Sequence, residues 1–237
     1  MLKYGISPLY QVMEQIECYI LKEGMKSHDK FPGERKLCEQ FGCNRVTLRN
    51  AFECMENIGK TYSIRGMGNY VAEQKVEICL LQYHSFSQHL MELGQKPSLE
   101  ILSVKKIEVS HKIAKHLDIK PESLVWETKT IVTVKDIPVV LETSWICAEE
   151  YPQIKRDELE KKEVYEVFQS QYHIDLEYGN ETIGITNAQP EEAEYLEISD
   201  NAPLFFVQRT GGTAEKPVIY SQAVVRPDKI QFVSVLK

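Results

Sequence analysis

Residues 32–49 read PGERKLCEQFGCNRVTLR, and this stretch decides the fold of the N-terminal part of the chain. Its first half predicts a short helix that starts around residues 33–34. Gly42 then permits a tight turn, because glycine adopts left-handed backbone conformations without strain. Asn44 follows as a favourable N-cap for a second helix. The stretch therefore predicts two helices joined by a glycine-centred turn.

The second of these helices is expected to have an outward basic face. Arg45 and Arg49 are four residues apart, so they are neighbours on one side of a helix, with Thr47 nearby. An exposed basic face beside a tight turn suits a protein that reads the major groove of DNA. Taken alone, an arginine pair at this spacing is more often only a solvated face. The inward stripe is expected at Val46, Leu48, Ala51, Phe52, Met55 and Ile58.

The segments on either side complete a recognisable domain. Residues 8–23 have apolar residues at helical spacing and predict an earlier helix, with Ser7 as its cap. Residues 62–71 predict a small β-hairpin that turns at residues 65–68. Three helices followed by a hairpin predict a winged helix-turn-helix domain over residues 1–72.

Charge is distributed unevenly along the 237 residues, whose formal net charge is −7. Residues 1–72 hold ten Lys and Arg against eight Asp and Glu, a net charge of +2. Residues 73–237 hold eighteen against twenty-seven, a net charge of −9. Contacts with DNA phosphates are therefore expected only in the first part.

The chain has no apolar run near the ~20 residues that span a bilayer and no secretory signal, which predicts a cytoplasmic protein without a membrane partner.

The cysteines and histidines give no pattern of a metal or cofactor site. No cysteine pair has Cys-x-x-Cys spacing and no histidine pair completes a zinc motif, so reduced, mostly buried thiols are expected. The six histidines are scattered along the sequence, and we find no nucleophile with a partner base, which argues against an enzyme. The cysteines are Cys18, Cys38, Cys43, Cys54, Cys79 and Cys147.

The rest of the chain predicts a second domain at residues 85–237, after a connector at residues 73–84. Strands joined by short turns and interrupted by small helices imply an antiparallel sheet with helices on one face, so the fold class of the chain is α+β. Strands are expected at residues 99–109, 125–134, 138–146, 177–187, 204–211, 217–225 and 231–236. Helices are expected at residues 87–94, 112–117, 164–172 and 190–196.

These elements resemble the GntR-type bacterial transcription regulators, in particular the HutC-like branch, whose effector domain is called UTRA and resembles chorismate lyase in fold. The N-terminal match is ordered and specific. It includes residues 8–11, 31–35, 41–42, 44–45 and 47–49, Gly59, and the wing residues 65–66, 68 and 70–71. The C-terminal match is looser. It includes Ser85, Phe86, Gly94, Pro97, residues 136–142, Tyr165, Tyr172, and residues 203–204, 209–210 and 217–232.

The resemblance implies a DNA-binding set. Arginine suits this role because its guanidinium can donate two hydrogen bonds to guanine O6 and N7. Arg35 lies early in the supporting helix, where a backbone phosphate is the expected target. The positions that contact operator DNA in the family are Arg35, Arg45, Thr47, Arg49 and Gly66, and the further phosphate contacts expected here are Lys36, Arg65 and Asn69.

The resemblance also implies a small-molecule effector pocket beside the sheet, which in the family often takes a sugar phosphate or a carboxylate-bearing compound. The strand at residues 125–134 lacks the arginines that hold phosphate in such members, and only Lys129 offers a point charge there. Glu163 stands where those members have a serine and would repel an anion. These departures argue against a phosphosugar. The expected effector-binding residues are Ser85, Phe86, Lys129, Glu142 and Tyr165.

Other roles remain open for several of these residues. Glu142 can instead be a solvent-facing carboxylate on a strand, and Ser85 can be the N-cap of the next helix. Arg209 and Arg226 are expected to pair with acidic neighbours and hold the sheet rather than bind a ligand.

The function predicted from all of this is a homodimeric repressor that binds an inverted-repeat operator and is released by a small metabolite. Two alternatives remain from other classes of protein. The second domain can be an enzyme, as its likeness to chorismate lyase allows. The chain can also be a structural DNA-binding protein that responds to no ligand.

Overall fold

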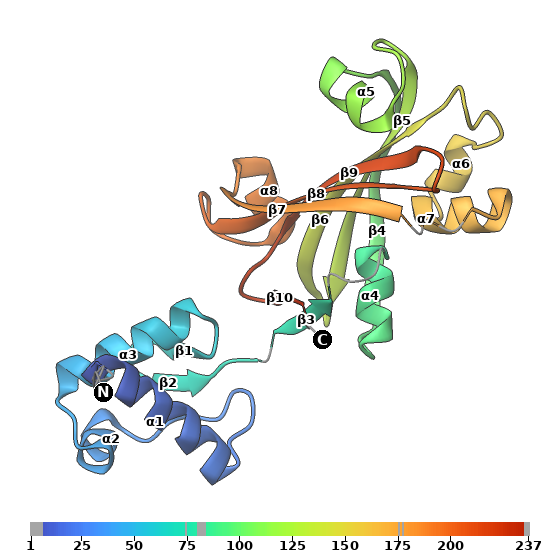
Figure 1. Ribbon diagram of the computed structural model, residues 1–237. Helices are drawn as coiled ribbons and strands as arrows, with labels where there is room; N and C mark the ends of the chain where they lie inside the picture. The colour runs from blue at the N-terminus through green and yellow to red at the C-terminus, as the bar shows by residue number, and fades with distance from the viewer. Residues whose placement is uncertain (1–6, 74, 80–83, 175, 177, 235–237) are drawn as a thin grey trace, which may run out of the picture. The chain divides into compact units, whose positions relative to one another are not determined.

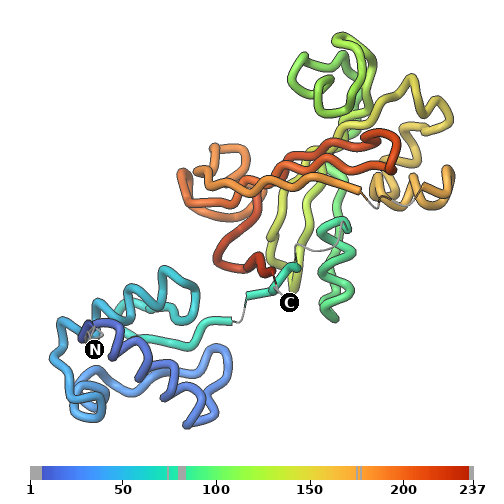
Figure 2. The backbone as a smooth tube through the Cα atoms, in the orientation of Figure 1, coloured from blue at the N-terminus to red at the C-terminus, as the bar shows by residue number. Residues whose placement is uncertain are grey.

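The computed structural model describes residues 7–73, 75–79, 84–174, 176 and 178–234. The chain divides into two compact units, one ending at Lys75 and the other starting at Val76. Each unit has a hydrophobic core of its own, and the backbone of each can be followed in Figures 1 and 2. Within the described ranges, no helix has the length and apolar character needed to cross a membrane.

The first unit has three helices and a two-stranded antiparallel hairpin, in the order expected for a winged helix-turn-helix. The bounds observed for the helices and the hairpin differ little from those expected from the sequence. The elements are α1 (Pro8–Glu23), α2 (Glu34–Phe41), α3 (Arg45–Asn57), β1 (Thr61–Ile64) and β2 (Gly68–Val71).

Local sequence explains where these helices begin and end. Gly24 and Gly42 end α1 and α2 in the left-handed conformation, with φ of +62° and +64°. The Asn44 side chain accepts a hydrogen bond from the backbone N–H of Thr47 at 2.8 Å and caps α3. Ser7 occupies the N-cap position of α1 as expected, but its side chain makes no capping hydrogen bond.

The core of the first unit lies between α1 and α3, with contributions from α2 and the hairpin. Its buried members are Val12, Ile16, Tyr19, Phe31, Leu37, Leu48, Ala51, Phe52, Met55 and Val71. Val46 and Ile58 were expected here but are exposed, at 69% and 45%. Val46 lies about 200° around the helix from Leu48, so the two cannot share a face. Ile58 lies at the C-cap, beyond the last helical turn.

The second unit is built on a six-stranded antiparallel sheet with the strand order β4-β5-β6-β9-β8-β7. Figure 1 shows short helices around this sheet. The six strands are β4 (Pro97–Glu108), β5 (Leu124–Val134), β6 (Ile137–Cys147), β7 (Tyr178–Asn187), β8 (Pro203–Gly212) and β9 (Pro217–Val225). The helices are α4 (Phe86–Glu92), α5 (His111–Leu117), α6 (Arg156–Leu159), α7 (Val164–Val167), the π-helix η1 (Phe168–Tyr172) and α8 (Pro190–Leu196).

Helices cover both faces of this sheet, which corrects the expectation of helices on one face. Ile131 and Val132 are adjacent in β5, so they point to opposite faces, and both are buried. Val132 belongs to a core with Phe86 and Leu90 of α4. Ile131 belongs to a core with Leu196 of α8. Apolar side chains on both faces require a cover on each side.

Two segments form structure that the sequence did not predict. The strand β3 (Val76–Cys79) pairs in parallel with β10 (Ile230–Val233), so the start and the end of this unit lie side by side (Figure 2). The short helix α6 was not expected either. Residue 177, at the expected start of the fourth strand, and residues 235–236, at the end of the last one, lie outside the described residues.

Candidate DNA interface and buried polar band

The outward face of α3 carries the side chains expected to meet DNA. Arg45 and Arg49 are exposed there, while Thr47 is half-buried. Thr47 donates a side-chain hydrogen bond to the capping oxygen of Asn44 at 3.1 Å, so its hydroxyl also supports the start of the helix. Val46 joins this face as an exposed apolar side chain, and such a group can contact a thymine methyl. The sequence analysis missed Val46 because it assigned it to the core.

Arg49 already has a partner on the neighbouring helix. Its Nε and terminal nitrogen donate to the two carboxylate oxygens of Glu34 at 2.8 and 2.9 Å. This fork lowers the pKa of Glu34 and ties α2 to α3. The Arg49 side chain is nevertheless 67% exposed. Water can replace an exposed partner of this kind, so the guanidinium can leave Glu34 for a base edge.

The other side chains expected to contact DNA differ in whether they already pair with an acidic side chain of the protein. Within the described part of the chain, Arg45 has no hydrogen bond or ion pair, although it lies near enough to Glu34 to lower its pKa. Arg35 pairs with Glu39 one turn along α2 at 3.1 Å, and both side chains are mostly exposed. Lys36 is also exposed on α2. Arg45 is therefore the arginine of α3 that needs no rearrangement to reach DNA.

The hairpin presents its turn to solvent. Arg65 and Gly66 are exposed, and Gly66 has a φ of +77° that favours glycine. A Cβ added at Gly66 would meet no atom within 4 Å, so only backbone conformation restricts this position. Asn69 accepts a hydrogen bond from Ser63 at 2.6 Å and is committed to holding the two strands together.

In the second unit, a row of polar side chains crosses the sheet between two apolar clusters. Cross-strand partners share a face, so the register places these side chains together. One apolar cluster packs under α4, and the other under α6, α7 and η1. We call these residues the polar band: Thr128 and Thr130 on β5, Glu142 and Ser144 on β6, Ser221 on β9, Arg209 on β8 and Glu181 on β7.

Arg209 is the centre of the polar band and is only 2% exposed. Its Nε donates to Glu181, and a terminal nitrogen donates to the carbonyl oxygen of His84 at 3.0 Å. Its guanidinium carbon lies 4.5 Å from the centre of the Phe86 ring. Tyr165 and Glu142 are close enough to favour its charged form against the effect of burial. The expected pairing of Arg209 with an acidic neighbour is thus observed.

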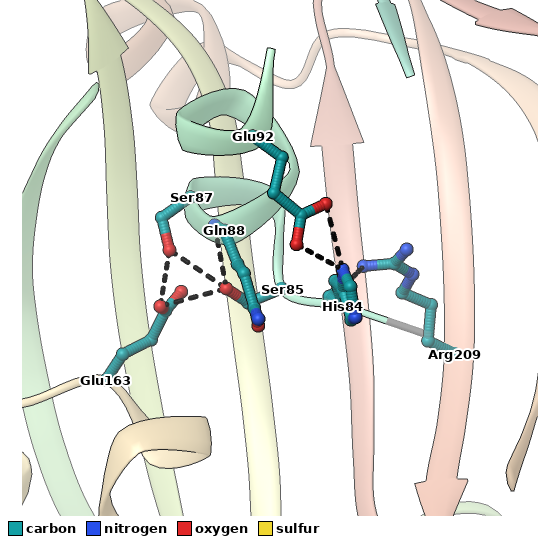
Figure 3. Close-up of polar contacts among 7 residues, drawn as sticks. All are labelled: His84, Ser85, Ser87, Gln88, Glu92, Glu163 and Arg209. Atoms are coloured by element: carbon teal, nitrogen blue, oxygen red, sulfur yellow. Dashed lines mark hydrogen bonds and ion pairs between the residues drawn. The ribbon is translucent and has the colours of Figure 1, made fainter. Parts of the chain in front are cut away.

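Glu163 approaches the band from the residue before α7. Ser85 donates to its Oε2 at 3.0 Å, and Ser87 donates to the same oxygen (Figure 3). Ser85 also caps α4, because its Oγ accepts from the backbone N–H of Gln88 at 3.2 Å. Ser85 therefore caps α4 and also lies beside the polar band.

Burial shifts both carboxyl groups toward their protonated forms. Burial raises the pKa of Glu163 to about 7, although hydrogen bonds from Ser87 and Ser85 oppose it. Burial also raises the pKa of Glu142, against the positive charge of Arg209. Glu142 is 3% exposed, so the alternative of a solvent-facing carboxylate was wrong.

The structure brings four of the five expected effector-binding residues together and separates the fifth. Ser85, Phe86, Glu142 and Tyr165 gather around Arg209 and Glu163. Lys129 lies between Thr128 and Thr130 on β5, so its side chain projects from the opposite face. There it donates to Glu191 of α8 at 2.5 Å. Lys129 is therefore not part of the polar band.

Arg226 also follows its expected structural role. Its guanidinium pairs with Asp228 at 2.7 Å and donates to the carbonyl oxygens of Pro138 and Leu196 at 3.3 and 3.1 Å. These contacts join the residue after β9 to the start of β6 and to the end of α8.

His84 and His89 lie side by side, although the six histidines are scattered along the sequence. His84 pairs with Glu92 at 3.0 Å, and its ring centre lies 5.2 Å from that of His89 (Figure 3 draws His84 and Glu92). Ligand atoms of the three residues lie within 4.8 Å of one another. His89 and Glu92 are three residues apart on α4, a helical spacing that places both on one side.

Comparison with known proteins agrees with this architecture. The UTRA domain model matches residues 92–231, more than half of the chain. The chain belongs to the UTRA domain family. The uncharacterised HTH-type transcriptional regulator YurK of Bacillus subtilis is 28% identical over 98% of this chain and 97% of its own length. The HTH-type transcriptional repressor NagR of the same species is 27% identical over 94% and 92%.

Solved structures show the same fold across both units. PhnF from Mycobacterium smegmatis matches with a TM-score of 0.66 and 22% identity, over 95% of this chain and 99% of its own. Together with the relatives, this confirms the expected membership of the GntR-type regulators of the HutC-like branch. The chain is a DNA-binding regulator of transcription that responds to a metabolite. The comparisons group it with regulators and not with enzymes.

Proposed function

We propose that the chain is a homodimeric cytoplasmic repressor, in which α3 reads an inverted-repeat operator and the polar band responds to a small effector. The observation that carries this proposal is the exposed face of α3, where Arg45, Val46 and Arg49 project beside a glycine turn. A helix of this kind reads only a few base pairs. Two copies related by a twofold axis read two half-sites, which supplies the specificity that an operator needs.

Each expected DNA contact then has a chemical role. Arg45 and Arg49 donate to guanine edges in the major groove, and Val46 packs against a thymine methyl. Arg35 and Lys36 on α2, with Arg65 on the hairpin, neutralise phosphates and set the register of the helix in the groove. Gly66 lets the hairpin backbone approach the minor groove without a side chain in between.

The effector is a small polar metabolite held at the polar band. Other relatives are named for the use of fructoselysine, of mannosyl-D-glycerate and of histidine, all small polar compounds. Effector binding changes operator affinity by some factor, and operator binding must change effector affinity by the same factor. That reciprocity requires two states of the dimer that both ligands distinguish.

A mobility-shift titration on the DNA upstream of the chain's own gene tests the proposal, with scrambled DNA of equal length as the control. We expect the upstream DNA to bind more tightly at low and at moderate salt. Equal affinity for both DNAs at every salt concentration would contradict it.

A further inference from the structure

Among the described residues, the polar band holds more acidic groups than basic ones. Glu142 and Glu181 belong to it and face the cation Arg209, and Glu163 reaches it from the residue before α7 and lies near Glu142. Arg209 is also fully engaged by Glu181, by the His84 carbonyl and by the Phe86 ring. An anionic ligand would therefore meet a surplus of acidic groups and a guanidinium that already has partners.

The band also contains buried hydrogen-bonding atoms that no described residue satisfies. One oxygen each of Glu142, Glu163 and Glu181 is buried without a hydrogen-bond partner, as is the hydroxyl of Thr128, while the buried Ser221 hydroxyl lies close enough to Glu142 to lower its pKa. Thr128 and Ser221 are 2% and 0% exposed, and the register directs both toward the face of Glu142. Leaving such a group unsatisfied destabilises the folded chain, so native proteins keep few of them.

The chemistry of these atoms indicates what satisfies them. The three carboxylate oxygens accept hydrogen bonds, and the two hydroxyls both donate and accept. A ligand that fits must therefore be rich in donors, with a positive charge among them. We propose that the polar band binds an organic ammonium compound that also carries hydroxyl groups. This inference rests on the proposed function, since it assigns the chemical class of the effector.

Protonation of the band gives the proposal a second consequence. A cation bound here favours the ionised forms of Glu142 and Glu163, whose pKa values burial raises, so binding releases protons. Affinity for the cation should then increase with pH through the region around pH 7. The other titratable or charged groups that face these two carboxyls or lie beside them are Glu166 and Tyr165 of α7, Glu181 of β7, Arg209 of β8, and His84 and His89 at α4.

Three matched acyclic polyols test the ligand class on the full chain by calorimetry and thermal shift at millimolar concentration. D-glucamine carries an ammonium group, D-glucitol replaces it by a hydroxyl, and D-glucitol 6-phosphate is an anion. We expect D-glucamine to bind at least ~10-fold more tightly than the other two, the ratio that one favourable charge interaction supplies. We also expect its affinity to rise between pH 6 and pH 8, a range in which its ammonium stays protonated.

Two substitutions locate the binding. Glu142→Gln keeps the shape of the side chain and should reduce the D-glucamine affinity ~10-fold, and Glu163→Gln should flatten the pH dependence. Lys129→Gln, on the opposite face of β5, is the matched control and should change neither. Melting curves of each variant show whether it folds.

Preference for D-glucitol 6-phosphate, or no binding of D-glucamine, would overturn the ligand class. The mobility shift of the same protein preparation is independent of these outcomes. Retained operator binding alongside a failed D-glucamine test would refute this inference and leave the proposed regulator intact.

Discussion

Each unit contains an arginine–glutamate ion pair, and the two pairs differ in burial. Burial determines whether the arginine can exchange its glutamate for another partner. Arg49 and Glu34 pair on the surface of the first unit, with side chains 67% and 34% exposed. Arg209 and Glu181 pair inside the second unit, with side chains 2% and 19% exposed. Water can replace either partner of the exposed pair, so Arg49 is available to another ligand. Water cannot readily replace a partner of the buried pair. Separating that pair therefore leaves charged groups in the interior without a partner or solvent.

The comparison assigns the two pairs different roles. The exposed pair positions an arginine that can exchange a carboxylate for a base edge. The buried pair fixes the centre of the polar band, beside which burial raises the pKa values of Glu142 and Glu163. In the proposed function, the DNA-reading arginine must be free to exchange its partner, whereas Arg209 must stay in place.

Removing the buried arginine should have the largest effect on stability. We expect Arg209→Ala to lower the free energy of unfolding of the second unit by about 3–5 kcal/mol, because it leaves Glu181 buried without its partner. Urea denaturation of the full chain, followed by tryptophan fluorescence, measures this, since Trp126 and Trp145 both lie in the second unit. Arg49→Ala serves as the control and should leave the transition unchanged. The same unfolding transition for Arg209→Ala and Arg49→Ala would contradict the claim that the buried pair contributes more to stability than the exposed pair.

The buried carboxyl should make stability depend on pH. Burial raises the pKa of Glu163 from its ordinary value of 4.5 to about 7 in the folded chain, so the folded state holds its proton more firmly. Its contribution to stability is full below pH 4.5 and is lost as pH rises through 7, a change of about 3 kcal/mol. Unfolding free energies at pH 5 and pH 8 should therefore differ less for Glu163→Gln than for the natural chain. The same pH difference in both proteins would contradict this.

The cap of α3 should have a smaller effect, confined to the first unit. Asn44→Ala removes the hydrogen bond to the Thr47 N–H and should lower helix stability by about 1 kcal/mol. Ser7→Ala is the matched control, because Ser7 holds the same position on α1 without a capping bond and should change nothing. Thermal unfolding of the first unit, followed by circular dichroism, compares the two. A larger loss for Ser7→Ala would show that the cap of α3 is not the important one.

Sequence patterns predicted those parts of the fold that depend on local chemistry. Gly24, Gly42 and Asn44 mark helix ends through their own backbone and side-chain properties, and these ends were found as expected. The parallel pairing of β3 with β10 joins segments about 150 residues apart, and no local pattern encodes such a contact. Covering both faces of the sheet also depends on tertiary packing.

The candidate sites show the same limit. Arg45 and Arg49 could be placed outward from helical spacing, but Val46 was misplaced because the apolar stripe was extended too far around the helix. Strand alternation in residues 128–130 already places the Lys129 side chain on the face opposite to Thr128 and Thr130, so its separation from the polar band could be predicted from the sequence. The hydrogen bond of Ser87 to Glu163 could not be foreseen, since it joins residues far apart in the sequence.

The central claim is that exposed arginines of α3 read the operator. The most direct measurement is the affinity ratio between the upstream DNA and scrambled DNA for the natural chain and for Arg45→Ala. Loss of one bidentate guanine contact removes about 1–3 kcal/mol of discrimination, so the ratio should fall roughly 5- to 150-fold. Arg35→Ala, which removes a phosphate contact, should instead weaken binding to both DNAs alike. An unchanged ratio for Arg45→Ala would contradict the account.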